Sequence, residues 1–180
     1  MHDTELETIV RSIVERVVDD AVSHSDANRA TVALGADHGG YPLKETLKAH
    51  LSKQGWQVDD AGTHSADAVD YPDFAVAVAQ RVANGHARFG IMIDGAGIGS
   101  CMAANKVAGV RAALCYDLST ARNAREHNNA NLLTLGAGLI GAALAAQIVD
   151  TFLSTECTES RHLRRVEKID ALDGRRTRVG

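Results

Sequence analysis

The chain begins with a stretch whose apolar side chains recur at helical spacing. Between residues 4 and 22 they follow one another three or four positions apart, which places them on one stripe of a helix. The stripe comprises Leu6, Ile9, Val10, Ile13, Val14, Val17, Val18 and Ala21. Thr4 and Glu7 have the spacing of a capping box, and residues 23–28 are small and polar, as in a linker. The pattern predicts an amphipathic helical appendage over 1–28, followed by the main domain over 29–180.

From residue 29 onward, short apolar runs alternate with stretches of helical period. The predicted strands are 29–34, 57–61, 89–93, 110–116 and 132–135, and the predicted helices are 43–51, 74–83, 100–106, 119–126, 140–153 and 161–176. Strands separated by helices indicate an α/β fold with a parallel, doubly wound sheet of about five strands. Ligands of such sheets bind beyond the carboxyl ends of the strands, so we look for chemistry in the loops that follow strands.

Composition narrows the classes of protein and of partner. The 180 residues are 45% hydrophobic and 23% charged, which is typical of one folded globular domain. A formal net charge of -4 gives no basic field for nucleic acid or an anionic membrane, so we expect a small ligand. No apolar run approaches the roughly 20 residues that span a bilayer, and the N-terminus lacks a secretory signal.

The cysteines and histidines give no sign of a metal or a disulfide framework. Cys101, Cys115 and Cys157 form no C-x-x-C pair and leave an odd thiol, which favours a reducing cytoplasm. There is no H-x-x-x-H pattern either. We therefore expect a cytoplasmic protein without a metal or a cofactor.

The first loop after a strand is Gly35-Ala36-Asp37-His38-Gly39-Gly40. It places a carboxylate and an imidazole at a strand end, beside glycines that allow a ligand to approach closely. The alternative is that Asp37 caps the next helix and His38 is solvated.

The second loop, Asp94-Gly95-Ala96-Gly97-Ile98-Gly99-Ser100, stands between an apolar strand and a helix. Successive glycines let backbone N–H groups converge on an anion, either a phosphate or the oxyanion of an enediolate. A dinucleotide site is an alternative, since Asp117 follows the next strand. The spacing G-x-G-x-G on a later strand argues against it.

Two further clusters are polar. Residues 126–131 place His127 before three amides, and such a segment either moves protons near neutral pH or caps and turns the chain. Arg161 and Arg165 fall on one helical face, where they can hold a phosphate or form an exposed basic face.

Taken together, these motifs resemble ribose-5-phosphate isomerase B and the related galactose-6-phosphate isomerase subunits. The motifs that carry the resemblance are G-A-D-H-G-G-Y-P-L-K at 35–44, D-Y-P-D-F-A at 70–75, G-A-G-I-G-S-C-M-A-A-N-K at 95–106, G-V-R-A-A at 109–113, R-E-H-N-N-A-N at 125–131 and R-H-x-x-R at 161–165. The resemblance covers about 30–172. It implies a Rossmann-like three-layer fold and a metal-free aldose-ketose isomerase, most simply of ribose 5-phosphate to ribulose 5-phosphate. It further implies a homodimer or tetramer whose active sites are shared between two subunits.

The resemblance also implies a role for each motif. His127 matches the residue that opens the furanose ring, and Asp37 matches an acidic residue of the sugar site, so we predict both as catalytic together with Asp94. The predicted substrate-binding residues are His38, Tyr71, Gly95, Gly97, Ile98, Gly99, Ser100, Asn128, Arg161 and Arg165. Among them, the glycines match the loop that stabilises the enediolate, and the two arginines match residues that hold the phosphate.

The chain shows three departures from the family pattern, of which the first concerns Asp94 and Ser100 together. Asp94 stands where many members have a cysteine as the base, and Ser100 where others have a glutamate. Ala96 replaces a Thr or Ser, and Gly138 replaces an arginine. A carboxylate in a glycine-lined pocket can serve as a base, so Asp94 is the predicted base. One alternative is a non-catalytic phosphosugar-binding subunit, because Asp94 with Ser100 and Met102 resembles the A subunit of galactose-6-phosphate isomerase. The other is an isomerase of another short phosphosugar.

The leading helix is not part of the family pattern. With its linker, it resembles the peptides that direct enzymes into bacterial microcompartments, which implies docking of residues 4–22 on a shell or cargo protein. The alternative is that it packs on its own oligomer.

Overall fold

The computed structural model describes Arg11, Val14 and residues 31–173. The predicted appendage over 1–28, with its capping box and linker, lies outside these residues apart from Arg11 and Val14. Its role as a targeting peptide therefore stays a prediction. Among the residues that are described, no helix has the length and apolar character needed to cross a membrane.

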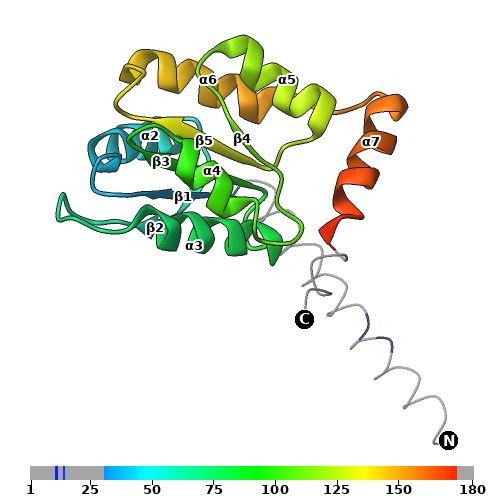
Figure 1. The fold of residues 1–180 in the computed structure, drawn as a ribbon, viewed down its shortest axis with the longest axis horizontal. Coiled ribbons are helices and arrows are strands. Elements are labelled where there is room, and N and C mark those ends of the chain that lie inside the picture. The colour runs from blue at the N-terminus through cyan, green and yellow to red at the C-terminus, as the bar shows by residue number, and fades with distance from the viewer. Residues whose placement is uncertain (1–10, 12–13, 15–30, 174–180) are drawn as a thin grey trace, which may run out of the picture.

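Five parallel strands form one sheet in the order β2-β1-β3-β5-β4 (Figure 1). The strands are β1 (Thr31–Ala36), β2 (Gln57–Gly62), β3 (Phe89–Asp94), β4 (Ala112–Leu114) and β5 (Leu132–Gly136). From β1 the chain continues to β2 on one side, and β3 lies on the other side of β1. The neighbouring ends of β1 and β3 are thus a switch point of the sheet, and the predicted α/β class is confirmed.

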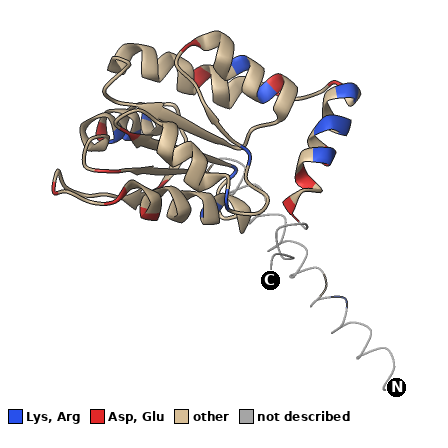
Figure 2. Cartoon of the chain, in the orientation of Figure 1, with Lys and Arg blue, Asp and Glu red and all other residues tan. Residues whose placement is uncertain are grey.

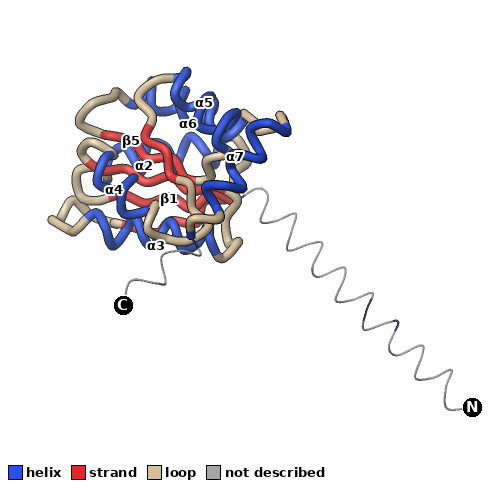
Figure 3. The backbone as a smooth tube through the Cα atoms, turned by 45° about the vertical axis from the view of Figure 1, so that its right-hand side comes forward, coloured by secondary structure: helices blue, strands red, loops and turns tan. Residues whose placement is uncertain are grey.

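Helices cover both faces of the sheet, which gives three layers (Figure 3). The helices are α2 (Tyr41–Lys53), α3 (Tyr71–Ala83), α4 (Ile98–Ala104), α5 (Leu118–Asn128), α6 (Ala142–Ser154) and α7 (Ser160–Asp170). Helices α2, α5 and α6 pack on one face, and α3 and α4 pack on the other. Helix α7 contacts α5 and stands at one end of the sheet (Figure 1).

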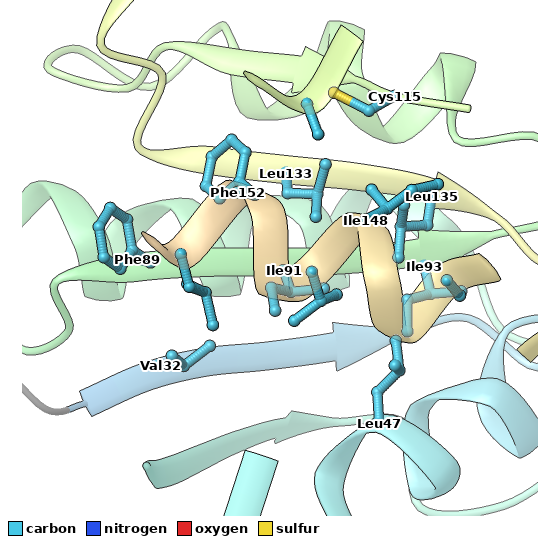
Figure 4. Packing of buried hydrophobic residues seen from close by; sticks show 14 of the residues in the cluster. Val32, Leu47, Phe89, Ile91, Ile93, Cys115, Leu133, Leu135, Ile148 and Phe152 are labelled. Atoms are coloured by element: carbon cyan, nitrogen blue, oxygen red, sulfur yellow. The ribbon is translucent and has the colours of Figure 1, made fainter. Parts of the chain in front are cut away.

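The strands supply the two halves of the core by alternation of their side chains. Phe89, Ile91 and Ile93 of β3 pack beneath α6 with Ile148 and Phe152 (Figure 4). Met92, between them, points to the opposite face and packs with α3. Each fully buried aliphatic side chain contributes about 1.5–3 kcal/mol, so this packing sets the positions of all strand ends.

The element boundaries differ from the predicted ones where local chemistry extends a helix. Helices α2 and α3 begin at Tyr41 and Tyr71, because Pro42 and Pro72 are tolerated in a first turn, where no N–H partner is needed. The left-handed Gly97, with φ of 77°, starts α4 at Ile98. Strand β4 keeps only three of the seven residues predicted for it.

A buried ion pair joins α2 to the carboxyl end of β2. Lys44 is fully buried, and its Nζ donates to both carboxylate oxygens of Asp60 at 2.8 Å. Lys48 donates to the same carboxylate at 2.6 Å, and the Gly62 N–H donates at 3.0 Å. The sequence shows no sign of this pair, because lysine is almost never fully buried.

Replacing Asp60 by asparagine leaves the buried Lys44 ammonium with one charged partner, Glu45, whose Oε1 lies 2.8 Å from Nζ on a side chain that is 43% exposed. We expect Asp60→Asn to lower the free energy of unfolding by about 3 kcal/mol, measured by urea denaturation. The control is Lys48→Met, which removes a partner whose side chain is 40% exposed and should cost about 1 kcal/mol or less. Equal losses in the two variants would contradict the assignment of the buried pair.

The same pair predicts a pH dependence. Burial alone would raise the pKa of Asp60, but the hydrogen bonds from Lys44, Lys48 and Gly62 outweigh it and lower the pKa to about 2. A lowered pKa stabilises the fold above the ordinary carboxyl pKa of about 3.9, and this stabilisation is lost as the pH falls through the folded value. The difference in stability between wild type and Asp60→Asn should therefore shrink between about pH 4 and pH 2. A constant difference in that range would contradict the lowered pKa of Asp60.

Candidate functional site

The switch point of the sheet carries two acidic residues on neighbouring strands. Ala36 of β1 is in register with Ile93 of β3, so Asp37 and Asp94 follow side by side at the carboxyl edge. The Asp37 N–H donates to the Ile93 carbonyl oxygen at 3.1 Å. An open cavity of about 240 Å³ lies there and is lined by Asp37, Tyr71, Asp94, Gly95, Ala96 and Gly99. All six lining residues belong to the loops and helix start that the sequence singled out.

Asp94 is the centre of the glycine loop. It is 5% exposed, and one carboxylate oxygen accepts the N–H of Ala96 at 2.8 Å and the N–H of Gly97. The other oxygen accepts the N–H of Ser100 at 3.1 Å and the Ser100 hydroxyl. A carboxylate has about four acceptor positions, so all of them are occupied. Asp94 borders the cavity, but it must release a hydrogen bond before it can accept a proton.

Asp37 has a different environment. It is 8% exposed, and its Oδ1 accepts the N–H of Gly40 at 2.9 Å. Its Oδ2 accepts no hydrogen bond from residues 31–173, which leaves this oxygen free for a ligand. Gly40 has to be a glycine, because a Cβ there would lie 2.3 Å from the Ile93 carbonyl oxygen. The tight packing of α2 on β3 therefore sets the position of Asp37.

The rest of the predicted carboxyl-edge residues surround the cavity or support it. Tyr71 packs on Gly99, where a Cβ would lie 2.5 Å from the phenol carbon Cζ. Gly95 faces open space, and Ser100 is fully buried against Asp94. His38 is exposed, with its Nδ1 3.2 Å from the carbonyl oxygen of Val69.

The other predicted site residues lie at the opposite edge of the sheet. His127 and Asn128 are in the last turn of α5, shortly before β5 begins at Leu132. Helix α7, which carries Arg161 and Arg165, is joined to the start of β4 by the ion pair between Arg111 and Asp170 at 2.8 Å. A six-residue strand such as β3 spans about 20 Å, at about 3.3 Å per residue. A single copy of the chain therefore does not bring this group to Asp37 and Asp94.

At this amino edge, the ring of His127 stacks on that of His162, with the ring centres 4.3 Å apart and the planes 16° apart. His162 is 4% exposed. Its pKa is lowered by burial and further by His127, Arg161 and Arg165. The two arginines are exposed and form no ion pair within the described part of the chain. Figure 2 shows Lys and Arg residues gathered on α7.

Arg125 is a buried residue of α5 that connects this helix to the segments around Ala130 and Thr155. No role was predicted for it from the sequence. It donates to the carbonyl oxygens of Thr155 at 3.1 Å and Ala130 at 2.6 Å, and its guanidinium lies 4.8 Å from the ring centre of Phe89. Burial, with the charge of Arg88, lowers the pKa of Arg125 to about 10. The sequence signal was a basic residue on the apolar face of α5, next to Ala121 and Ala124.

No cysteine takes the place of the one that the family pattern has at position 94. The Cys101 thiol donates to the Ala112 carbonyl oxygen at 3.4 Å, away from the cavity, and burial raises its pKa. Burial also raises the pKa of Cys115 to about 11. Among the described residues, no group of three or more His, Cys, Asp or Glu side chains is arranged to hold a metal ion.

Comparison with known proteins places this chain in a family. Residues 32–169 match the family described as Ribose/Galactose Isomerase. Ribose-5-phosphate isomerase B of Escherichia coli is 43% identical over 145 residues, which cover 81% of this chain and 97% of that protein.

Solved structures agree with the sequence comparison. The structure of ribose-5-phosphate isomerase B from Clostridium thermocellum has a TM-score of 0.79 and 47% identity, covering 81% of this chain and 98% of that one. The enzyme from Mycoplasma genitalium, solved with bound ribulose 5-phosphate, has a TM-score of 0.77 and 42% identity, covering 80% and 96%. The chain therefore belongs to the Ribose/Galactose Isomerase family of sugar phosphate isomerases.

Proposed function

We propose that this protein interconverts an aldose phosphate and a ketose phosphate, with ribose 5-phosphate and ribulose 5-phosphate as the first pair to test. The observation that carries the proposal is the cavity at the switch point, where a buried carboxylate with a free oxygen faces a glycine loop. The bound ribulose 5-phosphate of the Mycoplasma genitalium relative supports this choice of substrate.

The reaction needs a base, an acid and donors for an oxyanion. The base removes the proton from C2 of the open-chain aldose while the C1 oxygen gains a proton, which gives an enediol or enediolate. Return of a proton to C1 and loss of the proton from the C2 oxygen give the ketose. The N–H groups of Gly95 and Gly99, which have no acceptor within residues 31–173, are suitable donors for the developing negative charge.

The hydrogen bonds of the two carboxylates decide which of them can act as the base. Asp94, the base predicted from the sequence, can accept a proton only after its hydrogen bond from Ser100 or from a loop N–H breaks. Asp37 needs no such change, because its Oδ2 is free. We therefore assign the proton transfer between C1 and C2 to Asp37, and the shaping of the glycine loop to Asp94.

The residues predicted to bind the phosphate and to open the furanose ring lie at the amino edge of the sheet, whereas the cavity of the same subunit lies at the carboxyl edge. A second copy related by a twofold axis brings the amino edge of one subunit to the carboxyl edge of the other. His127 and Asn128 of one subunit then face the sugar ring, and Arg161 and Arg165 hold the phosphate. The absence of an arginine at Gly138 leaves these two with a larger share of phosphate binding.

Exposed apolar side chains support this association. Four of them lie after the carboxyl ends of β3, β4 and β5, at the edge of the sheet that a partner subunit would cover. They are Ile98, Met102, Leu118 and Leu139, which are 48%, 64%, 38% and 61% exposed.

A second candidate function is a non-catalytic phosphosugar-binding subunit. The four hydrogen bonds of Asp94 favour it, because the position that bears the base in many family members is here committed to the loop. This candidate predicts binding of a phosphosugar, no turnover by the purified protein, and activity on mixing with a relative that has the cysteine.

The roles of the two carboxylates can be separated by substitution. Asp37→Asn keeps the Oδ1 acceptor for Gly40 and removes the base, so we expect kcat with ribose 5-phosphate to fall by about 100-fold or more. Asp94→Asn should lose less activity, together with a lower melting temperature, because its NH2 group opposes the donors of the loop.

Turnover is measured across four- to six-carbon aldose phosphates, and the shift in melting temperature on adding each phosphosugar reports binding. If Asp37→Asn kept full activity and Asp94→Asn lost activity but still bound the phosphosugar, Asp94 and not Asp37 would be the base. No turnover by the wild type with any of these sugars would reject the isomerase in favour of the second candidate.

The shared site predicts complementation between inactive variants. We expect Asp37→Asn and His127→Asn to be nearly inactive alone and to regain up to about a quarter of wild-type activity when co-expressed. Half of the random dimers are mixed, and each mixed dimer has one site with both residues intact. If each site lay within one subunit, mixed dimers would have no intact site, and co-expression would restore nothing.

A further inference from the structure

The imidazole of His127 has a side-chain neighbour on its own helix. The Nδ2 atom of Asn123, one turn earlier on α5, lies 3.0 Å from the Nδ1 atom of His127. An amide nitrogen only donates hydrogen bonds, so the Nδ1 atom that receives this bond carries no proton. A neutral imidazole then has its proton on Nε2.

The Nε2 atom is left for a ligand. The carboxylate of Glu126 lies beside it, with Oε1 at 3.9 Å, which is beyond hydrogen-bond distance. The His127 side chain is 42% exposed. The proton on Nε2 therefore points toward a surface that a ligand or a partner can reach.

The stack on His162 fixes the plane of this ring. Both ring nitrogens of His162 are buried and without a hydrogen-bond partner within the described residues. Because burial, His127, Arg161 and Arg165 lower the pKa of His162, its ring is neutral at pH 7. A neutral, flat neighbour 4.3 Å away restrains the rotation of His127 and offers no hydrogen bond that competes with Asn123.

We propose that Asn123 is a positioning residue that holds His127 as the Nε2–H tautomer, with His162 as the surface on which the ring rests. The proposal rests on the proposed function, in which His127 opens the sugar ring. In that step the Nε2–H group donates a hydrogen bond to the ring oxygen and stabilises the negative charge that develops there as the bond between this oxygen and C1 breaks. The anomeric hydroxyl gives up its proton to water, the former ring oxygen takes a proton from water, C1 becomes the aldehyde carbon, and Nε2 keeps its proton.

With the opposite tautomer this step has no donor. A proton on Nδ1 would leave Nε2 as an acceptor only, and ring opening would have to wait for protonation from solvent. The enzyme would then lose rate in the chemical step, whereas the phosphate contacts of Arg161 and Arg165 would be unaffected. Asn123 thus acts on kcat and not on phosphate binding.

The test is the protonation state of the two His127 nitrogens in the full chain, read from long-range proton–nitrogen NMR correlations, with His127→Asn used for assignment. Asn123→Asp replaces the donor by an acceptor of the same shape, so it should move the proton to Nδ1. The matched control, Glu126→Gln, removes the nearby carboxylate and should leave the proton on Nε2.

For the wild type we expect the proton on Nε2, and for Asn123→Asp a fall in kcat on the order of 100-fold with KM changed by less than about twofold. A wild-type proton on Nδ1, or an Asn123→Asp variant that keeps the Nε2 proton or full kcat, would overturn the proposal. The NMR measurement needs no turnover, so it decides the tautomer even where the proposed isomerase activity fails.

Discussion

The polarity of a parallel sheet is the constraint on which the rest of this structure depends. Every strand ends at the same edge, and every helix that follows a strand returns to the other one. Asp37 follows β1 and Asp94 ends β3, so both lie at the carboxyl edge, whereas His127 is in the last turn of α5 and lies at the amino edge. Packing alone thus divides the polar residues into two groups about one strand length apart.

The carboxyl-edge group illustrates how a buried acid is accommodated. An ionised carboxylate is costly to bury unless hydrogen bonds compensate for lost hydration, and Asp94 receives four of them. Tyr116 adds a hydrogen bond of 2.7 Å to the Ala96 carbonyl oxygen, which holds the same loop from outside. The loop is therefore rigid before any ligand arrives, and a preorganised loop is what an oxyanion site requires.

The sequence predicted the order of strands and helices because apolar spacing depends on local geometry alone. It also identified the loops with Asp37 and Asp94, since glycines and acidic residues follow apolar strands there. The predicted helix over 119–126 and strand over 132–135 also place His127 just before a strand, but they did not show how far it lies from Asp37 and Asp94, because that distance depends on how the strands assemble into the sheet.

Side-chain partnerships were the other part that the sequence could not supply. The Lys44–Asp60 pair joins residues 16 positions apart, and the stack of His127 on His162 joins two helices. Such contacts depend on how elements pack in space. Asn123 is four positions from His127, a spacing that places two residues on one helical face. Its effect on the protonation of the imidazole depends on which ring nitrogen it contacts, and the spacing does not reveal that.

The division into two edges also suits the charge of a sugar phosphate. Figure 2 shows acidic residues along the start of α3 and the loop before it, at the carboxyl edge, and basic residues on α7. A phosphate dianion beside Asp37 would oppose ionisation of the sugar at C2, because like charges at short range raise the cost of a second negative charge. If one subunit supplies the carboxylates and its partner supplies Arg161 and Arg165, the phosphate is held at the far end of the sugar. Negative charge then develops near the loop N–H groups and away from the phosphate, which is the arrangement that an enediolate needs.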